Sequence, residues 1–207
     1  MRSFPSPRPL LLVLLALCLL LTACAPATAD PFAYAEGSFS LSVAGTYLPA
    51  ADPDGAPRPF TAEITAGPPQ NGDPTLRDLT VIFTSPDSLA GLTITATVTA
   101  SSEAAASEGA STEGVNRAVR FTYPSAYGSI QATAEGDELD GLLRFGEGWL
   151  PLGDVTEISP KDVDGRYTVT RRRGDREAVF TFVAGETLPT RVRLTDERGA
   201  LEMAVTP

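Results

Sequence analysis

The most reactive side chain in the sequence is the thiol of Cys24. The chain contains no histidine, and its only other cysteine is Cys18. Without histidine, the chain cannot build the Ser-His-Asp or Cys-His arrangements that activate a nucleophile. It also cannot build a zinc site from cysteine and histidine together. The chemistry that remains open at Cys24 is covalent modification of its sulfur, so the residues before it indicate what that modification is.

The residues before Cys24 have the layout of a secretory leader. Arg2 and Arg8 give a charged end, residues 10–21 form an unbroken apolar run, and the small Ala23 directly precedes Cys24. The run has twelve residues, whereas a helix that spans a bilayer needs about 20. This length favours a cleaved signal over a permanent transmembrane anchor.

Residues 21–24 (Leu-Thr-Ala-Cys) resemble a bacterial lipobox, in which a small residue precedes the cysteine. The resemblance implies that Cys24 carries a diacylglyceryl group, with acyl chains such as palmitate, and that a peptidase cuts between Ala23 and Cys24. Residues 1–23 are then the signal peptide, and two acyl chains hold the protein stably on the extracytoplasmic face of the cell membrane. Two alternatives stay open: a membrane-spanning helix, and cleavage without a lipid at the Ala-Cys-Ala site of residues 23–25.

Length and charge set the limits on domains and partners. The 184 residues from Cys24 onward suffice for one domain with a sizeable core. The formal net charge is −10, and it becomes −12 when Arg2 and Arg8 leave with the signal. Phosphate backbones repel such an acidic chain, so we expect no nucleic-acid partner. We expect a monomer that contacts the membrane through the lipid on Cys24.

The rest of the sequence alternates with the period of two that is typical of half-buried strands. Apolar side chains alternate with serines in residues 39–43, and every second residue of 93–99 is threonine, which fits a pleated surface with one wet face. Turn clusters between such segments predict eight to ten strands, mostly antiparallel. We expect a tether over residues 24–37 and a single β-rich domain over residues 38–207. The low-complexity residues 100–114 are predicted to be a flexible loop.

One segment changes period. Leu139, Leu142 and Leu143 follow the i, i+3, i+4 spacing of one helix face, which predicts a short helix over residues 137–145. The residues that would cap and end this helix are Asp137, Gly146 and Gly148.

The carboxyl-terminal third resembles the LolA-like lipoprotein-carrier superfamily. A tyrosine-bearing strand at residues 164–169 leads to a phenylalanine-rich strand around residues 180–182, then to the Gly-Glu-Thr-Leu-Pro segment at 185–189 and a strand with Val192 and Leu194. The resemblance implies an α+β, mainly β fold: a curved antiparallel sheet that forms an incomplete barrel, with a helix over its open side and a hollow that binds acyl chains or other lipid. An all-β sandwich is the alternative.

This resemblance makes the predicted helix a candidate lid over a ligand site. The inner rows of such a sheet either line a hollow or fill it, and alternation alone does not separate the two because both require apolar residues at every second position. The same ambiguity applies to Trp149, which either edges a groove or plugs the core. The candidate ligand-lining residues are Leu139, Leu142, Leu143, Phe145 and Trp149.

The charged clusters favour structural roles. Asp137, Glu138 and Asp140 suit a helix amino terminus. The Asp-rich segments 52–55 and 162–165 lack the later ligands of a calcium loop and are typical of turns. A solvated outer face is favoured for the arginine run 171–173 over a stripe that binds anions. We therefore expect no catalytic residue, no metal site, no cofactor and no enzymatic activity. The expected function is binding of lipid or another hydrophobic ligand, with a surface adaptor that has a packed core as the alternative.

Overall fold

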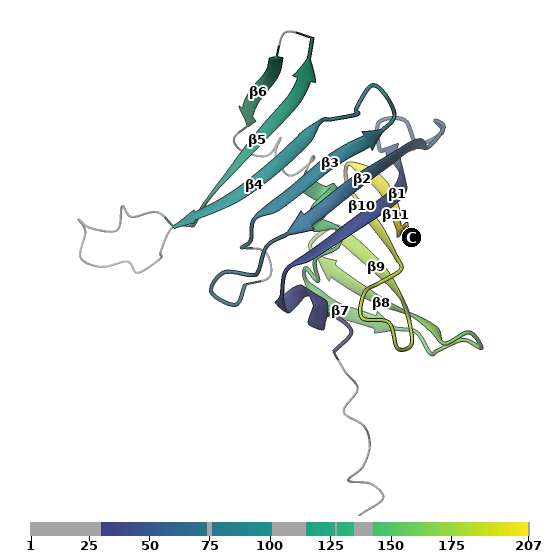
Figure 1. Cartoon of the computed structure of the whole chain (residues 1–207). Coiled ribbons are helices and arrows are strands. Elements are labelled where there is room, and N and C mark those ends of the chain that lie inside the picture. The colour runs from purple at the N-terminus through teal and green to yellow at the C-terminus, as the bar shows by residue number, and fades with distance from the viewer. Residues whose placement is uncertain (1–29, 74–75, 101–114, 127, 135–142, 207) are drawn as a thin grey trace, which may run out of the picture. The chain divides into compact units, whose positions relative to one another are not determined.

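The described part of the chain forms one open, curved antiparallel sheet of eleven strands (Figure 1). The computed structural model describes residues 30–73, 76–100, 115–126, 128–134 and 143–206. This confirms the expected fold class, a mainly β chain with one curved antiparallel sheet and a short helix, and a two-sheet sandwich is not found among these residues. The strands are β1 (Phe39–Pro49), β2 (Arg58–Ala66), β3 (Leu79–Ser85), β4 (Thr93–Ala100), β5 (Val115–Ser125), β6 (Gly128–Ala134), β7 (Asp154–Ile158), β8 (Arg166–Arg173), β9 (Arg176–Val183), β10 (Arg191–Asp196) and β11 (Gly199–Val205).

The strand order explains why a connecting segment must cross the sheet. From β1 the chain runs outward strand by strand to β6 at one edge, resumes at β7 on the opposite edge, and returns to β11, which pairs with β1. The segment between β6 and β7 therefore has to pass from one edge of the sheet to the other. Residues 143–152, which belong to it, are buried or partly buried throughout.

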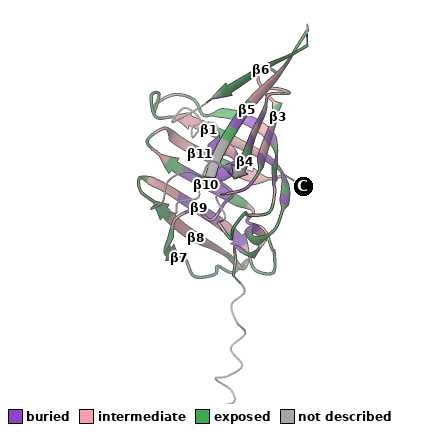
Figure 2. Ribbon diagram, turned by 90° about the vertical axis from the view of Figure 1, so that its left-hand side faces the viewer, coloured by how far each residue is buried: buried purple, intermediate pink, exposed green. Residues whose placement is uncertain are grey.

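Buried residues recur at alternate positions along several strands, as the sequence predicts (Figure 2). The buried apolar residues of the strands share one face of the sheet, which we call the inner face. β1 alternates between buried and exposed residues from Phe39 to Val43, and β9 alternates between buried and partly buried residues from Ala178 onward. The first strand begins at Phe39, where the alternation of residues 39–43 predicts it. The side chains of Val98 and Phe121, on β4 and β5, are only partly buried. Fully or nearly fully buried inner-face residues include Val43, Ile64, Val81, Ile94, Phe180, Val192, Leu201 and Met203.

The tether is shorter than predicted at its carboxyl end. Residues 31–37, assigned to the tether from their composition, fold with the domain and contain the 3-10 helix η1 (Ala33–Glu36). Phe32 packs edge-on against Phe180 and Phe182, with ring centroids 5.0 and 5.4 Å apart. Aromatic burial of this kind outweighs the extended preference of an alanine- and proline-rich stretch.

The predicted helix lies only partly within the described residues. Residues 143–147 are helical, so the helix includes Gly146 and runs two residues past the predicted end at 145, and Gly148 follows it in a turn. Residues 137–142, including Asp137, Leu139 and Leu142, lie outside the described residues, as do residues 101–114 of the predicted loop and the signal peptide with Cys24.

Candidate functional site

The candidate site is the inner face of the sheet together with residues 143–152, which we call the cover. Trp149 is 0% exposed, and Leu143 and Leu150 are each 1% exposed. Of the predicted ligand-lining residues, the structure thus brings Leu143, Phe145 and Trp149 onto the inner face. Leu143 and Trp149 are part of the packed core, and whether any of the three touches a ligand stays a prediction.

Phe145 joins the cover to the sheet through an aromatic cluster. Its ring centroid lies 5.0 Å from that of Phe60, 5.2 Å from that of Phe83 and 6.2 Å from that of Tyr47, all in edge-to-face geometry. Pairs of this kind contribute about 0.5–1.5 kcal/mol beyond the burial of their area. The cluster therefore holds the helical end of the cover over β1, β2 and β3.

Two glycines let the cover approach the sheet closely. A Cβ atom added at Gly146 would lie 2.6 to 2.9 Å from three side-chain atoms of Leu79. One added at Gly148 would lie 2.8 Å from Met203 Cε and 3.0 Å from the Arg144 carbonyl oxygen. Real Cβ contacts are not this short, so the positions seen for the cover depend on the absence of side chains at these two residues.

Polar contacts hold the other end of the cover. The Tyr34 hydroxyl, from η1, donates to the Trp149 carbonyl oxygen. Arg171, from β8, donates through Nε to the Leu152 carbonyl oxygen at 3.4 Å and through Nη2 to the Gly153 carbonyl oxygen. The end of the cover is thus bound by side chains from two elements far apart in the sequence.

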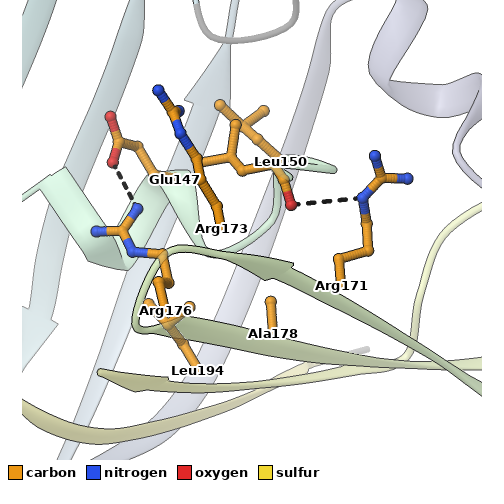
Figure 3. A pocket seen from close by; sticks show the side chains of 8 residues that line it. Glu147, Leu150, Arg171, Arg173, Arg176, Ala178 and Leu194 are labelled. Atoms are coloured by element: carbon orange, nitrogen blue, oxygen red, sulfur yellow. Dashed lines mark hydrogen bonds and ion pairs between the residues drawn. The ribbon is translucent and has the colours of Figure 1, made fainter. Parts of the chain in front are cut away.

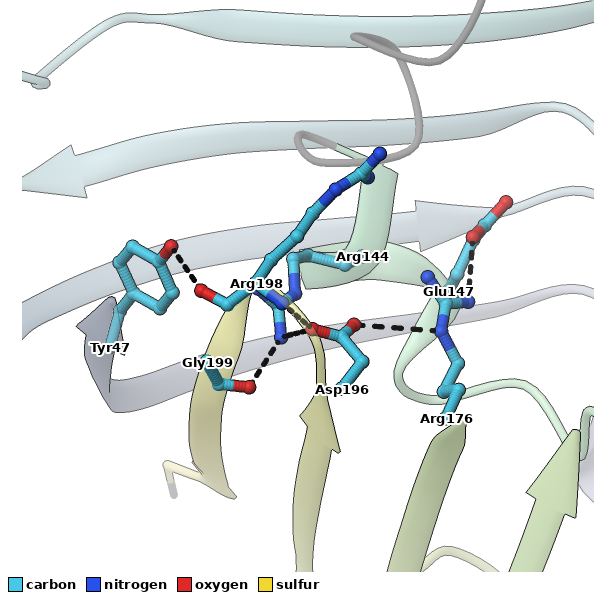
Figure 4. Close-up of polar contacts among 7 residues, drawn as sticks. All are labelled: Tyr47, Arg144, Glu147, Arg176, Asp196, Arg198 and Gly199. Atoms are coloured by element: carbon cyan, nitrogen blue, oxygen red, sulfur yellow. Dashed lines mark hydrogen bonds and ion pairs between the residues drawn. The ribbon is translucent and has the colours of Figure 1, made fainter. Parts of the chain in front are cut away.

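A buried ion network joins the cover to the β10–β11 hairpin (Figure 4). Arg144 is 1% exposed, and its Nη2 lies 2.8 Å from Asp196 Oδ1 and donates to the Gly199 carbonyl oxygen at 3.0 Å. Arg176 extends the network, with Nη1 3.2 Å from Glu147 Oε2 and Nε 3.8 Å from Asp196 Oδ2. Burial lowers the pKa of the Arg144 guanidinium, and the charge of Asp196 opposes that shift. The carboxylate of Asp196 therefore stabilises the positive charge of Arg144, which is buried away from water.

Three buried donors in the cover find no hydrogen-bond partner among the described residues. They are Nε and Nη1 of Arg144 and Nε1 of Trp149. A buried donor without a partner costs about 1–3 kcal/mol. The packing of the cover on the sheet is therefore less stable than the extent of its apolar burial suggests.

We expect the Tyr34 hydroxyl to make the domain less stable at alkaline pH. Its burial raises the pKa well above the ordinary value of 10.0, while Arg77 and Arg171 lower it by a smaller amount. A phenol whose pKa is raised by folding adds stability below the unfolded-state pKa, and that contribution is lost as the pH rises through and beyond about 10. We expect the free energy of unfolding to fall above pH 10 and to fall less in Tyr34→Phe, as measured by urea unfolding at stepwise pH. Parallel curves for the two proteins would contradict this role.

A small cavity opens where the cover meets the β8–β9 hairpin (Figure 3). Its volume is about 10 Å³, which is room for about one water molecule. We call it the arginine pocket. It is lined by Glu147, Leu150, Leu152, Arg171, Arg173, Arg176, Ala178 and Leu194.

The arginine pocket corrects the outer-face interpretation of the arginine run. Arg171 and Arg173 line the pocket on the same face of β8 as the buried Val169, whereas Arg172 points the opposite way and pairs with Glu177. The period of two required this, because residues 169, 171 and 173 have the same parity. The sequence interpretation missed the buried Arg144 and its partner Asp196, although an arginine between Leu143 and Phe145 was a visible signal.

The described residues contain no group of three or more Asp, Glu, Cys or His side chains that could hold a metal ion. Within the same ranges, no helix is both long enough and apolar enough to cross a bilayer.

Comparison with known proteins gives no family for this chain. No family model and no curated protein sequence matches it. A solved LolA superfamily protein from Nitrosomonas europaea is 15% identical, with 86% of this chain and 88% of that chain covered and a TM-score of 0.43. An uncharacterized conserved protein from Thermus thermophilus is 12% identical, with 86% and 81% covered and a TM-score of 0.42. A putative outer membrane lipoprotein-sorting protein domain from Vibrio parahaemolyticus is 9% identical, with 83% and 84% covered and a TM-score of 0.36. All three TM-scores are below 0.5, so these likenesses support no statement about the function of this chain.

Proposed function

We propose that this protein is a lipid-anchored extracytoplasmic lipoprotein that binds a lipid or another hydrophobic ligand, without catalysis, on the inner face of its sheet. The observation that carries the proposal is the cover itself. It is a connecting segment that crosses a continuous apolar face, and it keeps three buried donors without partners among the described residues. A lipid anchor on Cys24 would keep this face close to a source of lipid.

In this proposal the ligand takes the place of cover side chains. The arginine pocket, with a volume of about 10 Å³, cannot admit an acyl chain, and the part of the inner face that the cover contacts is occupied by the side chains of Leu143, Phe145 and Trp149. The position of the cover and the bound ligand are therefore alternatives. The apparent affinity is then reduced by the fraction of molecules in which the cover is closed.

Gly146→Val tests this competition. A side chain at residue 146 collides with Leu79, and overpacking of this kind costs about 1–3 kcal/mol. This cost destabilises the closed position of the cover and so raises the fraction of molecules that can bind the ligand. Each 1.4 kcal/mol of destabilisation then tightens ligand binding by about tenfold. We expect Gly146→Val to bind a fluorescent fatty acid about 5- to 140-fold more tightly than the unaltered protein, in an equilibrium titration.

Gly37→Val is the matched control. Residue 37 has extended backbone, and a Cβ atom placed there meets nothing within 4 Å. We expect its affinity for the fatty acid to equal that of the unaltered protein. Loss of stability in Gly146→Val without uptake of the probe by any of the three proteins would contradict ligand binding.

That contradicting result would favour the second candidate, a surface adaptor with a packed core. Its support is the two edge strands of the sheet, β6 and β7, beyond which no further described strand pairs. Ile130 on β6 is 62% exposed, and Val155 and Ile158 on β7 are 47% and 63% exposed. Edge strands of this kind can pair with a strand of another protein.

A further inference from the structure

The arginine pocket brings three guanidinium groups and one carboxylate to the end of the cover (Figure 3). The chain as a whole has a formal net charge of −10, so a local excess of positive charge runs against its composition. Arg171 and Arg173 come from β8, Arg176 begins β9 and Glu147 belongs to the cover. We propose that the arginines of this pocket bind an oxyanion, namely the anionic headgroup of the ligand whose apolar part lies on the inner face in place of the cover's side chains. This assignment rests on the proposed function.

The three arginines have different contacts. Arg171 donates to the carbonyl oxygens of Leu152 and Gly153, and its guanidinium lies 4.9 Å from the centroid of the Phe32 ring. Arg176 pairs with Glu147. The side chain of Arg173 is exposed and makes no hydrogen bond or ion pair with the described residues. Arg171 and Arg176 thus have structural roles as well, while Arg173 stands at the pocket with its donors available.

Guanidinium groups suit oxyanions in particular. Their planar donors match the oxygens of a carboxylate or phosphate in pairs, and hydrogen bonds between charged partners are about twice as strong as neutral ones. The pocket volume of about 10 Å³ admits one oxygen atom rather than a whole phosphate. The anionic group therefore sits at the mouth, where Arg173 can reach it, with one oxygen directed inward.

The remaining walls of the pocket favour an amphiphile over a free inorganic anion. Leu150, Leu152, Ala178 and Leu194 line it beside the arginines. Ala178 and Leu194 belong to β9 and β10, so they stay in place when the ligand displaces the cover, and they join the arginines to the apolar inner face. A free phosphate ion gains nothing from apolar walls. A charged lipid instead places its anionic group against the arginines and its acyl chain against the apolar side chains.

Arg173→Gln and Arg172→Gln form a matched pair for the test. Both remove one positive charge from the same strand at adjacent positions. Residue 173 lines the pocket, whereas Arg172 lies on the opposite face of β8 and pairs with Glu177. Both side chains are exposed, so neither substitution removes a core contact.

The experiment compares three probes on the full chain: a fluorescent fatty acid, its uncharged methyl ester and inorganic phosphate. We expect the acid to bind at least about tenfold more tightly than the ester at low ionic strength, and this preference to shrink as salt screens the charge. Arg173→Gln is expected to weaken binding of the acid by about tenfold and to leave the ester unchanged. Arg172→Gln should leave both affinities within about twofold, as expected for an exposed pair remote from the ligand.

The outcomes separate this inference from the proposed function. Equal binding of acid and ester, unchanged in Arg173→Gln, would overturn the headgroup site and leave hydrophobic binding standing. Binding of inorganic phosphate alone, weakened by Arg173→Gln, would assign the pocket to free oxyanions and overturn the headgroup assignment. Binding of none of the three probes would overturn both the site and the proposed function.

Discussion

Trp149→Ala is expected to lower the free energy of unfolding by about 3–5 kcal/mol, because removal of a large buried aromatic side chain leaves a cavity that the core fills only partly. Trp149 is 0% exposed and lies at the centre of the cover. The measurement is urea unfolding followed by circular dichroism. Fluorescence would not serve, since Trp149 is the only tryptophan in the chain.

Trp149→Phe is the control for this prediction. It keeps an aromatic ring in the core and removes the Nε1 donor, which has no partner among the described residues. Removal of this buried donor therefore offsets part of the free energy of unfolding that is lost with the smaller ring. We expect a loss well below that of Trp149→Ala. A loss under about 1 kcal/mol for Trp149→Ala itself would mean that the cover does not hold the core together.

Asp196→Ala is expected to destabilise the fold by about 3–5 kcal/mol, since it leaves Arg144 as a buried charge without its partner. Asp196 Oδ1 lies 2.8 Å from Arg144 Nη2 and also accepts a hydrogen bond from the Arg198 backbone nitrogen at 2.9 Å. The double variant Arg144→Met/Asp196→Ala removes both charges and is expected to recover much of the loss. A double-mutant cycle in urea measures the coupling between the two residues.

Asp164→Ala serves as the exposed counterpart. Asp164 Oδ2 lies 3.5 Å from Arg166 Nη1, and the Asp164 and Arg166 side chains are 63% and 59% exposed. Exposed pairs of this kind contribute between about 0 and 1 kcal/mol, so little change is expected. If Asp196→Ala behaved like Asp164→Ala, the ion network would not be what fixes the cover to the β10–β11 hairpin.

The strands and their inner face could be predicted from the sequence because a period of two acts locally. Apolar residues at alternate positions of residues 39–43 and of residues 93–98 define which side is buried without reference to any other segment. The same rule, applied from Val169, places Arg171 and Arg173 on the inner face, against the charge-based interpretation that put the arginine run outside. Here the backbone period was a better guide than residue charge.

The cover could not be predicted in the same way because its contacts are not local. Arg144 forms its buried ion pair with Asp196, which lies 52 positions later in the sequence. The Trp149 carbonyl oxygen accepts a hydrogen bond from Tyr34, which lies 115 positions earlier. No pattern in residues 143–152 reports those partners. Strand β7 could not be predicted from alternation either. All five of its residues are exposed, so no buried residues recur at alternate positions along it.

The most direct test of the account is mass spectrometry of the full-length gene product, purified from membranes and measured under native and then denaturing conditions. We expect a native mass that exceeds the denatured mass by one non-covalently bound lipid, and a denatured mass that corresponds to a chain beginning at Cys24 with a diacylglyceryl group attached. Equal native and denatured masses, together with no uptake of added fatty acid, would contradict ligand binding beneath the cover.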